Sequence, residues 1–304
     1  MCNVSDSNNH NRLSEESADE RALIELRKQV KNQSGIRAEL TRAKIKELEV
    51  QIKAENKMKL ALTKSRKTFV KNLTNIVDQS GSLSVLSLDR PNMTDLILSG
   101  GYAGAVEEFE KQSDNMARAS ELTNKIIQPN LIKSERDQFI INLAKQTATE
   151  RIFDELLIPK VSAGVRQSLL SLAFDTPLNL AMSNLSKRFE QAEKKELTEI
   201  NTEISMYGRG VSAALSQSAG IDYFLYTGPD DGLTRPFCLA IVNKVVSNKQ
   251  MIKLNNKQGL SVRTGGGGYN CRHSWTPVTM GFIKAASLDL ATDADISKAN
   301  GRAK

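Results

Sequence analysis

The sequence predicts a mainly α protein, in which long N-terminal helices and a helical middle region lead into a small α+β C-terminal module. Before residue 220 the chain is polar, and its apolar side chains recur every three or four positions, as in amphipathic helices. Residues 226–278 instead gather two of the three cysteines, the only tryptophan and four consecutive glycines. An apolar content of 39% with only 5% aromatic residues favours elongated helices over one thick globular core.

The N-terminal part divides into a leader and an arm. Residues 1–19 are rich in Ser and Asn and are expected to form a flexible leader. Residues 20–78 carry apolar residues at helical spacing and predict a helical arm, with Gly35 as a break between two helices. The arm either packs on its own chain as a hairpin or binds a partner or a symmetry mate. Its stripes are formed by Leu23, Leu26 and Val30, and by Ile45, Leu48 and Ile52.

A connector and a second helical region follow. Residues 79–104 contain clustered Gly, Pro and Ser and predict a connector with one short helix at 93–98. Residues 105–219 predict a helical domain, in which Pro129 and Pro159 end two of the helices. Its helices are expected at 105–127, 134–157, 162–174 and 178–219, the last of them either continuous or divided near Gly208 and Gly210.

The module occupies residues 220–278, where strand signals appear for the first time. An aromatic-rich run at 221–226 predicts a strand. The apolar run 239–246 is helix or strand, with a short helix favoured. A helical turn is expected at 249–255, a strand at 261–264, and an extended or loosely helical tail at 279–304.

The module also holds the candidate site residues: Asp230, Asp231, Arg235, Cys238, Cys271, Arg272 and His273. Cys238, Cys271 and His273 admit three interpretations: metal ligands, a Cys238–Cys271 disulfide, or buried thiols beside a hydrogen-bonded histidine. A structural zinc site takes four Cys and His ligands, so an aspartate would have to be the fourth. We favour the buried thiols, with Arg235 and Arg272 paired to the aspartates in a structural cluster around Trp275. No catalytic residue and no cofactor is predicted, and zinc is the ion that the three ligands would select.

The ends of this segment resemble a known family. Thr-Arg-Pro-x-Cys after an aspartate, followed by Gly-Tyr-Asn-Cys-Arg-His-x-Trp-x-Pro, is similar to the C-terminal module of phage minor head proteins, typified by the F protein of phage Mu. The matching residues are Asp230 or Asp231, Arg235, Cys238, Cys271, Arg272 and His273. The resemblance covers about the last quarter of the chain, and the common family ending has a cysteine where His273 stands.

The resemblance implies a structural, non-enzymatic component of a tailed-phage virion, present in multiple copies and acting in head morphogenesis or genome delivery. Its implied partners are portal, capsid or other virion proteins, and packaged DNA, which the net charge of +7 would favour. No transmembrane run and no signal peptide are indicated, so assembly in the host cytoplasm is expected. The alternatives are a virion-carried Cys-His hydrolase or metal-dependent nuclease, and a DNA-binding protein.

Overall fold

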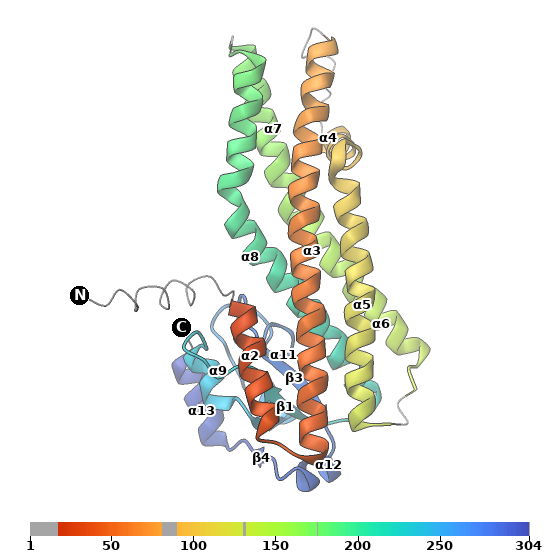
Figure 1. Cartoon of the computed structure of the whole chain (residues 1–304), viewed down its shortest axis with the longest axis vertical. Helices are drawn as coiled ribbons and strands as arrows, with labels where there is room; N and C mark the ends of the chain where they lie inside the picture. The colour runs from red at the N-terminus through yellow and green to blue at the C-terminus, as the bar shows by residue number, and fades with distance from the viewer. Residues whose placement is uncertain (1–17, 81–89, 130–131, 175, 304) are drawn as a thin grey trace, which may run out of the picture. The chain divides into compact units, whose positions relative to one another are not determined.

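The computed structural model describes residues 18–80, 90–129, 132–174 and 176–303 (Figure 1). The mainly α fold with a small C-terminal sheet is confirmed. The chain divides into two compact units: one holds the chain up to Ile52, Ala119–Ser134 and Ser212–Lys304, and the other holds Lys53–Arg118 and Glu135–Val211. The predicted leader, including Cys2, lies outside the described residues except at its last two positions.

The first unit begins with a helical hairpin. Helix α2 (Ala18–Lys31) turns into α3 (Gly35–Ser80), and Gly35 adopts a φ of +57° at the break, as predicted. Ala22 and Leu26 of α2 pack against Leu48 of α3. The apolar stripe of this part of the predicted arm is therefore buried against its own chain.

The second unit is a helical bundle that includes the remainder of α3. Its other elements are α4 (Arg90–Ile97), η2 (Leu98–Tyr102), α5 (Ala103–Ile127), α6 (Glu135–Glu150), η3 (Arg151–Leu157), α7 (Ile158–Ala173) and α8 (Leu178–Ser218), of which α5 and α8 end in the first unit. Helix α8 is continuous through Gly208 and Gly210. In α3, Leu62, Phe69 and Leu73 are fully buried, so this half of the predicted arm forms part of the bundle core.

The connector predicted at 79–104 lies outside the described residues at 81–89. From residue 90 on, α4 covers most of the short helix expected at 93–98, and the chain kinks at Gly101, whose φ of +152° is not helical. The interruption predicted at Pro159 is wrong. Pro159 does not end a helix but stands in the first turn of α7, directly after the π-helix η3. A wider π-turn accommodates the missing N–H donor and the ring of proline, which would otherwise break an α-helix.

A four-stranded sheet forms the centre of the C-terminal module. Its order is β3 (Ser274–Val278), β1 (Tyr223–Thr227), β2 (Lys244–Ser247) and β4 (Asp289–Leu290). Strand β1 is antiparallel to both neighbours, whereas β2 and β4 are parallel. The short helices are α9 (Pro236–Ile241), α10 (Asn248–Met251), α11 (Val262–Gly265), α12 (Met280–Ala285) and α13 (Asp293–Arg302).

The structure corrects three predictions for this module. The strand expected at 261–264 is instead helix α11, where the Asn256 side chain donates to the carbonyls of Leu260 and Gly266 and closes the loop. The run 239–246 divides into the end of α9 and strand β2. The expected tail at 279–304 is folded: α13 begins with a Thr292–Asp295 capping box and packs against α9.

Each face of the sheet has its own apolar cluster. Leu225, Val245 and Val278 pack with Leu40 of α3 on one face. Phe224 and Tyr226 point to the other face, where Trp275 and the two cysteines lie. This alternation follows from the two-residue period of β1 and places the candidate site on the second face. None of the described helices is long and apolar enough to cross a membrane.

Candidate functional site

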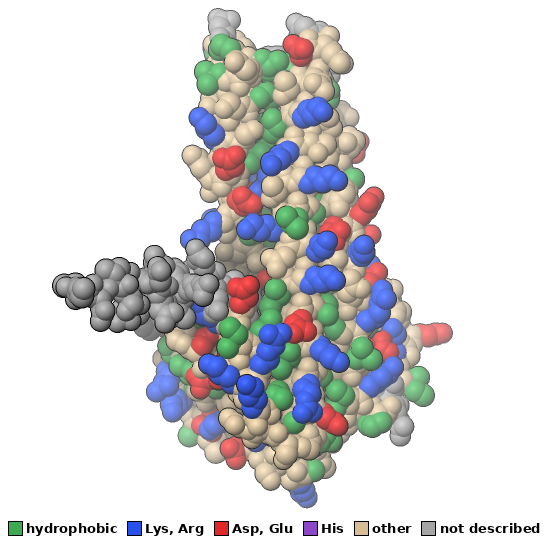
Figure 2. Space-filling model, in the orientation of Figure 1, with side chains coloured by type: hydrophobic (Ala, Val, Ile, Leu, Met, Phe, Trp, Pro, Cys, Tyr) green, Lys and Arg blue, Asp and Glu red, His purple; other side chains and the backbone are tan. Residues whose placement is uncertain are grey.

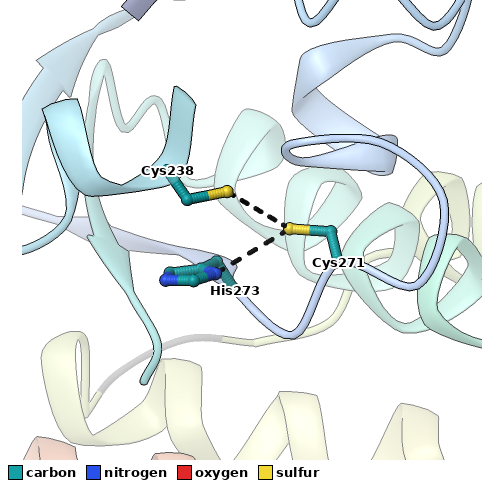
Figure 3. A group of neighbouring side chains, drawn as sticks. All are labelled: Cys238, Cys271 and His273. Carbon is teal, nitrogen blue, oxygen red and sulfur yellow. Dashed lines mark hydrogen bonds between the residues drawn. The ribbon is translucent and has the colours of Figure 1, made fainter. Parts of the chain in front are cut away.

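Three short segments bring Cys238, Cys271 and His273 together (Figure 3). Cys238 lies on α9, Cys271 in the loop after α11, and His273 directly before β3. Their ligand atoms all lie within 4.8 Å of one another, and all three residues are buried. The predicted association of these residues is therefore present in the fold.

The contacts in this cluster exclude a disulfide in the structure. The Sγ atoms of Cys238 and Cys271 are 3.8 Å apart, far longer than the roughly 2.05 Å of a disulfide bond. The Sγ atom of Cys271 lies 3.9 Å from Nδ1 of His273. The cluster is thus two thiols and one imidazole in contact.

Tyr226 completes the cluster and was not predicted from the sequence. Its hydroxyl lies 3.3 Å from Sγ of Cys238 and 3.4 Å from Sγ of Cys271. Its ring stacks on His273, with 5.1 Å between the centroids and 17° between the planes, and it also contacts Trp275. The signal in the sequence was the two-residue period of β1, which places Phe224 and Tyr226 on the face that receives the cysteines.

The glycines of the module allow the backbone to approach the cluster. A Cβ atom on Gly267 would stand 2.3 Å from Sγ of Cys238, and one on Gly228 would stand 2.4 Å from the His273 ring. Gly266 has a φ of +57°, and a Cβ atom there would lie 2.9 Å from Sγ of Cys271. The backbone N–H of Gly267 donates to Sγ of Cys271 at 3.1 Å. The backbone of Gly266 and Gly267 therefore packs directly against the sulfur atoms of Cys238 and Cys271.

An ion pair between Asp231 and Arg272 holds the two ends of the segment. Nη1 and Nη2 of Arg272 donate to Oδ2 and Oδ1 of Asp231 at 2.6 and 2.7 Å. The Asp231 carboxylate also accepts from the Leu233 N–H and the Thr234 hydroxyl. These contacts tie the turn after β1 to the segment that precedes β3.

The other two predicted members of this charge cluster have different positions. Asp230 is exposed, so Asp231 is the aspartate that faces Arg272. Arg235 is the N-cap residue of α9 and forms no ion pair within the described part of the chain. The predicted pairing of Arg235 with an aspartate is wrong because the turn directs Asp231 toward Arg272 instead.

The environment shifts several pKa values. The hydrogen bond from Arg272 lowers the pKa of Asp231 to about 2. Contact with Cys271, together with burial, raises the pKa of Cys238 above its usual value. Burial likewise raises the pKa of Tyr226. The raised pKa values keep the thiol of Cys238 and the hydroxyl of Tyr226 protonated in the absence of a cation, so Cys238 has the chemistry of a soft ligand rather than of an activated thiolate nucleophile.

Comparison of the chain with protein-family models, curated proteins and solved structures finds no match.

Proposed function

We propose that the chain is a structural, non-enzymatic minor component of a tailed-phage virion, associated with the head or portal and acting in head morphogenesis or genome delivery. The observation that carries the proposal is the convergence of the residues that resemble phage minor head proteins. Asp231 pairs with Arg272, while Cys238, Cys271 and His273 meet in one buried cluster. Contacts of this kind stabilise a small domain with a thin core, which supports a structural role for the module.

The state of the two thiols supports a structural rather than a hydrolytic role. A cysteine nucleophile acts as a thiolate and needs access to substrate. Cys238 and Cys271 are 1% and 4% exposed, and the pKa of Cys238 is raised. The Cys-His hydrolase alternative would require the opposite of both properties.

Exposed apolar side chains in the second unit support assembly with partners. Phe139 and Leu143, four residues apart on α6, are 66% and 51% exposed. Single exposed apolar residues are common, but neighbours on one helical face are typical of contact surfaces. We propose that this pair contacts the portal, capsid or neighbouring copies of the chain.

The charge of the chain supports contact with DNA less directly than the exposed apolar pair supports contact with proteins. The net charge is +7. On the face shown in Figure 2, Lys and Arg side chains are interspersed with Asp and Glu. A nucleic-acid-binding surface usually presents a clustered basic patch, so packaged DNA remains a secondary partner in this proposal.

The proposal is tested by mass spectrometry of washed phage particles from cells that encode the chain. We expect the chain at low copy number in intact heads. A chain found only in the soluble fraction of the lysate would overturn the virion role.

A surface variant tests the proposed contact. Combining Phe139→Ser with Leu143→Ser should leave a folded chain that is lost from particles. Gln138→Ser, at an exposed polar position of the same helix, is the matched control and should be incorporated normally. Normal incorporation of the double variant would remove this pair from the assembly surface.

A further inference from the structure

The spacing of the two buried sulfurs matches that of two ligands on one metal ion. Two thiolates at about 2.3 Å from a tetrahedral zinc ion are about 3.8 Å apart. Sγ of Cys238 and Sγ of Cys271 are 3.8 Å apart. A ring nitrogen of His273 completes a group whose ligand atoms all lie within 4.8 Å of one another, and Nδ1 lies 3.9 Å from Sγ of Cys271. Figure 3 shows the three side chains pointing toward one another, with Cys271 in contact with both others.

The Tyr226 hydroxyl lies at the distances from the two sulfurs that a fourth ligand would have. With oxygen at about 2.0 Å and sulfur at about 2.3 Å from a tetrahedral ion, the oxygen–sulfur edge is about 3.5 Å. The hydroxyl lies 3.3 Å from Sγ of Cys238 and 3.4 Å from Sγ of Cys271. The sequence analysis expected an aspartate as the fourth ligand, but the Tyr226 oxygen has the required distances instead. Asp231 is not available for this role, because its carboxylate is paired with Arg272.

The charge balance of the cluster and the hydrogen bond that it accepts from Gly267 also fit a bound metal ion. A divalent cation with two thiolates, a neutral imidazole and a neutral hydroxyl is uncharged overall, so burial carries no net charge penalty. The N–H of Gly267 donates to Sγ of Cys271 at 3.1 Å, an outer contact that orients a sulfur ligand. Glycines at positions 266 and 267 leave the room that these sulfurs need.

We propose that Cys238, Cys271, His273 and Tyr226 form a closed structural zinc site in the C-terminal module. The sulfur ligands select zinc over magnesium or calcium, which prefer oxygen. On binding, the two thiols lose their protons to solvent and the hydroxyl oxygen and Nδ1 each donate a lone pair. The site is independent of the proposed virion role, because a zinc-stabilised module could serve either a structural or an enzymatic protein.

The metal content of the full-length chain tests this site. Purified without chelators and then dialysed with zinc chloride, the chain should carry one zinc ion per molecule by plasma mass spectrometry. After replacement by Co²⁺, it should show sulfur-to-cobalt charge-transfer absorption and the intense visible bands of a tetrahedral site. Absence of bound zinc after dialysis, or a weak octahedral cobalt spectrum, would overturn the proposal.

Variants identify the ligands. Cys238→Ser and Cys271→Ser should lose the ion, whereas Cys2→Ser should retain it. Tyr226→Phe keeps the ring but removes the oxygen, so it should release zinc to a competing chelator several-fold faster than the unmodified chain. Equal release rates would remove Tyr226 from the ligand set. Because the serine variants could unfold for other reasons, the cobalt spectrum of the unmodified chain decides the proposal.

Discussion

Arg272 donates two parallel hydrogen bonds of 2.6 and 2.7 Å to Asp231, which lies 41 positions earlier in the sequence. The Arg272 side chain is 9% exposed and that of Asp231 is 17% exposed. Two charges so far removed from water stabilise the fold only as a pair, and removing one leaves the other unsatisfied. This pair therefore fixes the turn after β1 against the start of β3, near which Cys271 and His273 lie.

Asp231→Ala should lower the free energy of unfolding of the module by about 3 kcal/mol, because it leaves the Arg272 guanidinium buried without its carboxylate. Trp275, the only tryptophan, lies in this module and reports its urea unfolding by fluorescence. The neighbouring and exposed Asp230 provides the control, since Asp230→Ala should change little. Equal effects of the two variants would contradict the assigned pairing.

The same pair predicts a defined acid sensitivity. The pKa of Asp231 is lowered from 3.8 to about 2, so its contribution is fully present above about pH 4 and is lost as pH falls toward 2. The stability difference between the unmodified chain and Asp231→Ala should shrink over this window. Urea unfolding at a series of pH values measures it, and a difference that stays constant down to pH 2 would contradict the assigned pKa.

The sequence identified Asp231, Cys238, Cys271, Arg272 and His273 as members of this site, but it missed Tyr226 and also included Asp230 and Arg235, which take no part in it. The sequence alone could not distinguish the two adjacent aspartates, or the two arginines, as partners in an ion pair. The conformation of the turn at residues 228–234 determines that Asp231 rather than Asp230 faces inward. Tyr226 looked like an ordinary strand residue. Its role depends on the register of β1 against β3, which pairs it with Trp275.

The helical fold was predictable because amphipathic spacing is a local property. The prediction that Pro159 ends a helix was wrong, because the π-helix that accommodates this proline depends on the surrounding bundle. The C-terminal residues 279–304 looked polar because α13 buries only a narrow stripe, in which Ile296 is 3% exposed and Ala299 is 0% exposed. The Thr292–Asp295 capping box was the missed signal for that helix.

Helix α13 should therefore be essential for the stability of the module. Ile296→Ala removes a buried side chain from the cluster that contains Tyr226 and both cysteines, and should cost about 2–4 kcal/mol. Lys298→Ala, at an exposed position of the same helix, should have little effect. Urea unfolding monitored by Trp275 compares the two, and an unchanged midpoint for Ile296→Ala would show that α13 is dispensable.

The second unit contains a buried ion pair of its own. The guanidinium of Arg66 on α3 donates to the Glu196 carboxylate on α8, and Glu193 lies 3.7 Å away. Glu196→Ala should destabilise the bundle by about 3 kcal/mol, because the Arg66 charge stays buried with a more distant partner. Thermal unfolding by circular dichroism measures this loss. Glu190→Ala, exposed on the same helix, should leave the transition unchanged, and a similar shift in both variants would argue against the pair.

Gly267 provides the sharpest test of packing around the two sulfurs. In Gly267→Ala, the new Cβ atom would stand 2.3 Å from Sγ of Cys238 and 3.3 Å from the Phe237 ring, so the thiol has to move. Overpacking of this kind costs about 1–3 kcal/mol. We expect a lower urea midpoint and faster reaction of Cys238 with a thiol reagent under native conditions.

The matched control for this variant is Gly232→Ala, where an added Cβ atom meets nothing within 4 Å. Gly232 lies in the same module and its φ is not positive, so the substitution adds neither a clash nor backbone strain. Its urea midpoint and thiol reactivity should equal those of the unmodified chain. If Gly267→Ala behaved like Gly232→Ala, the backbone of the glycine run would not press against Cys238, and the close packing that confines the two sulfurs would be refuted.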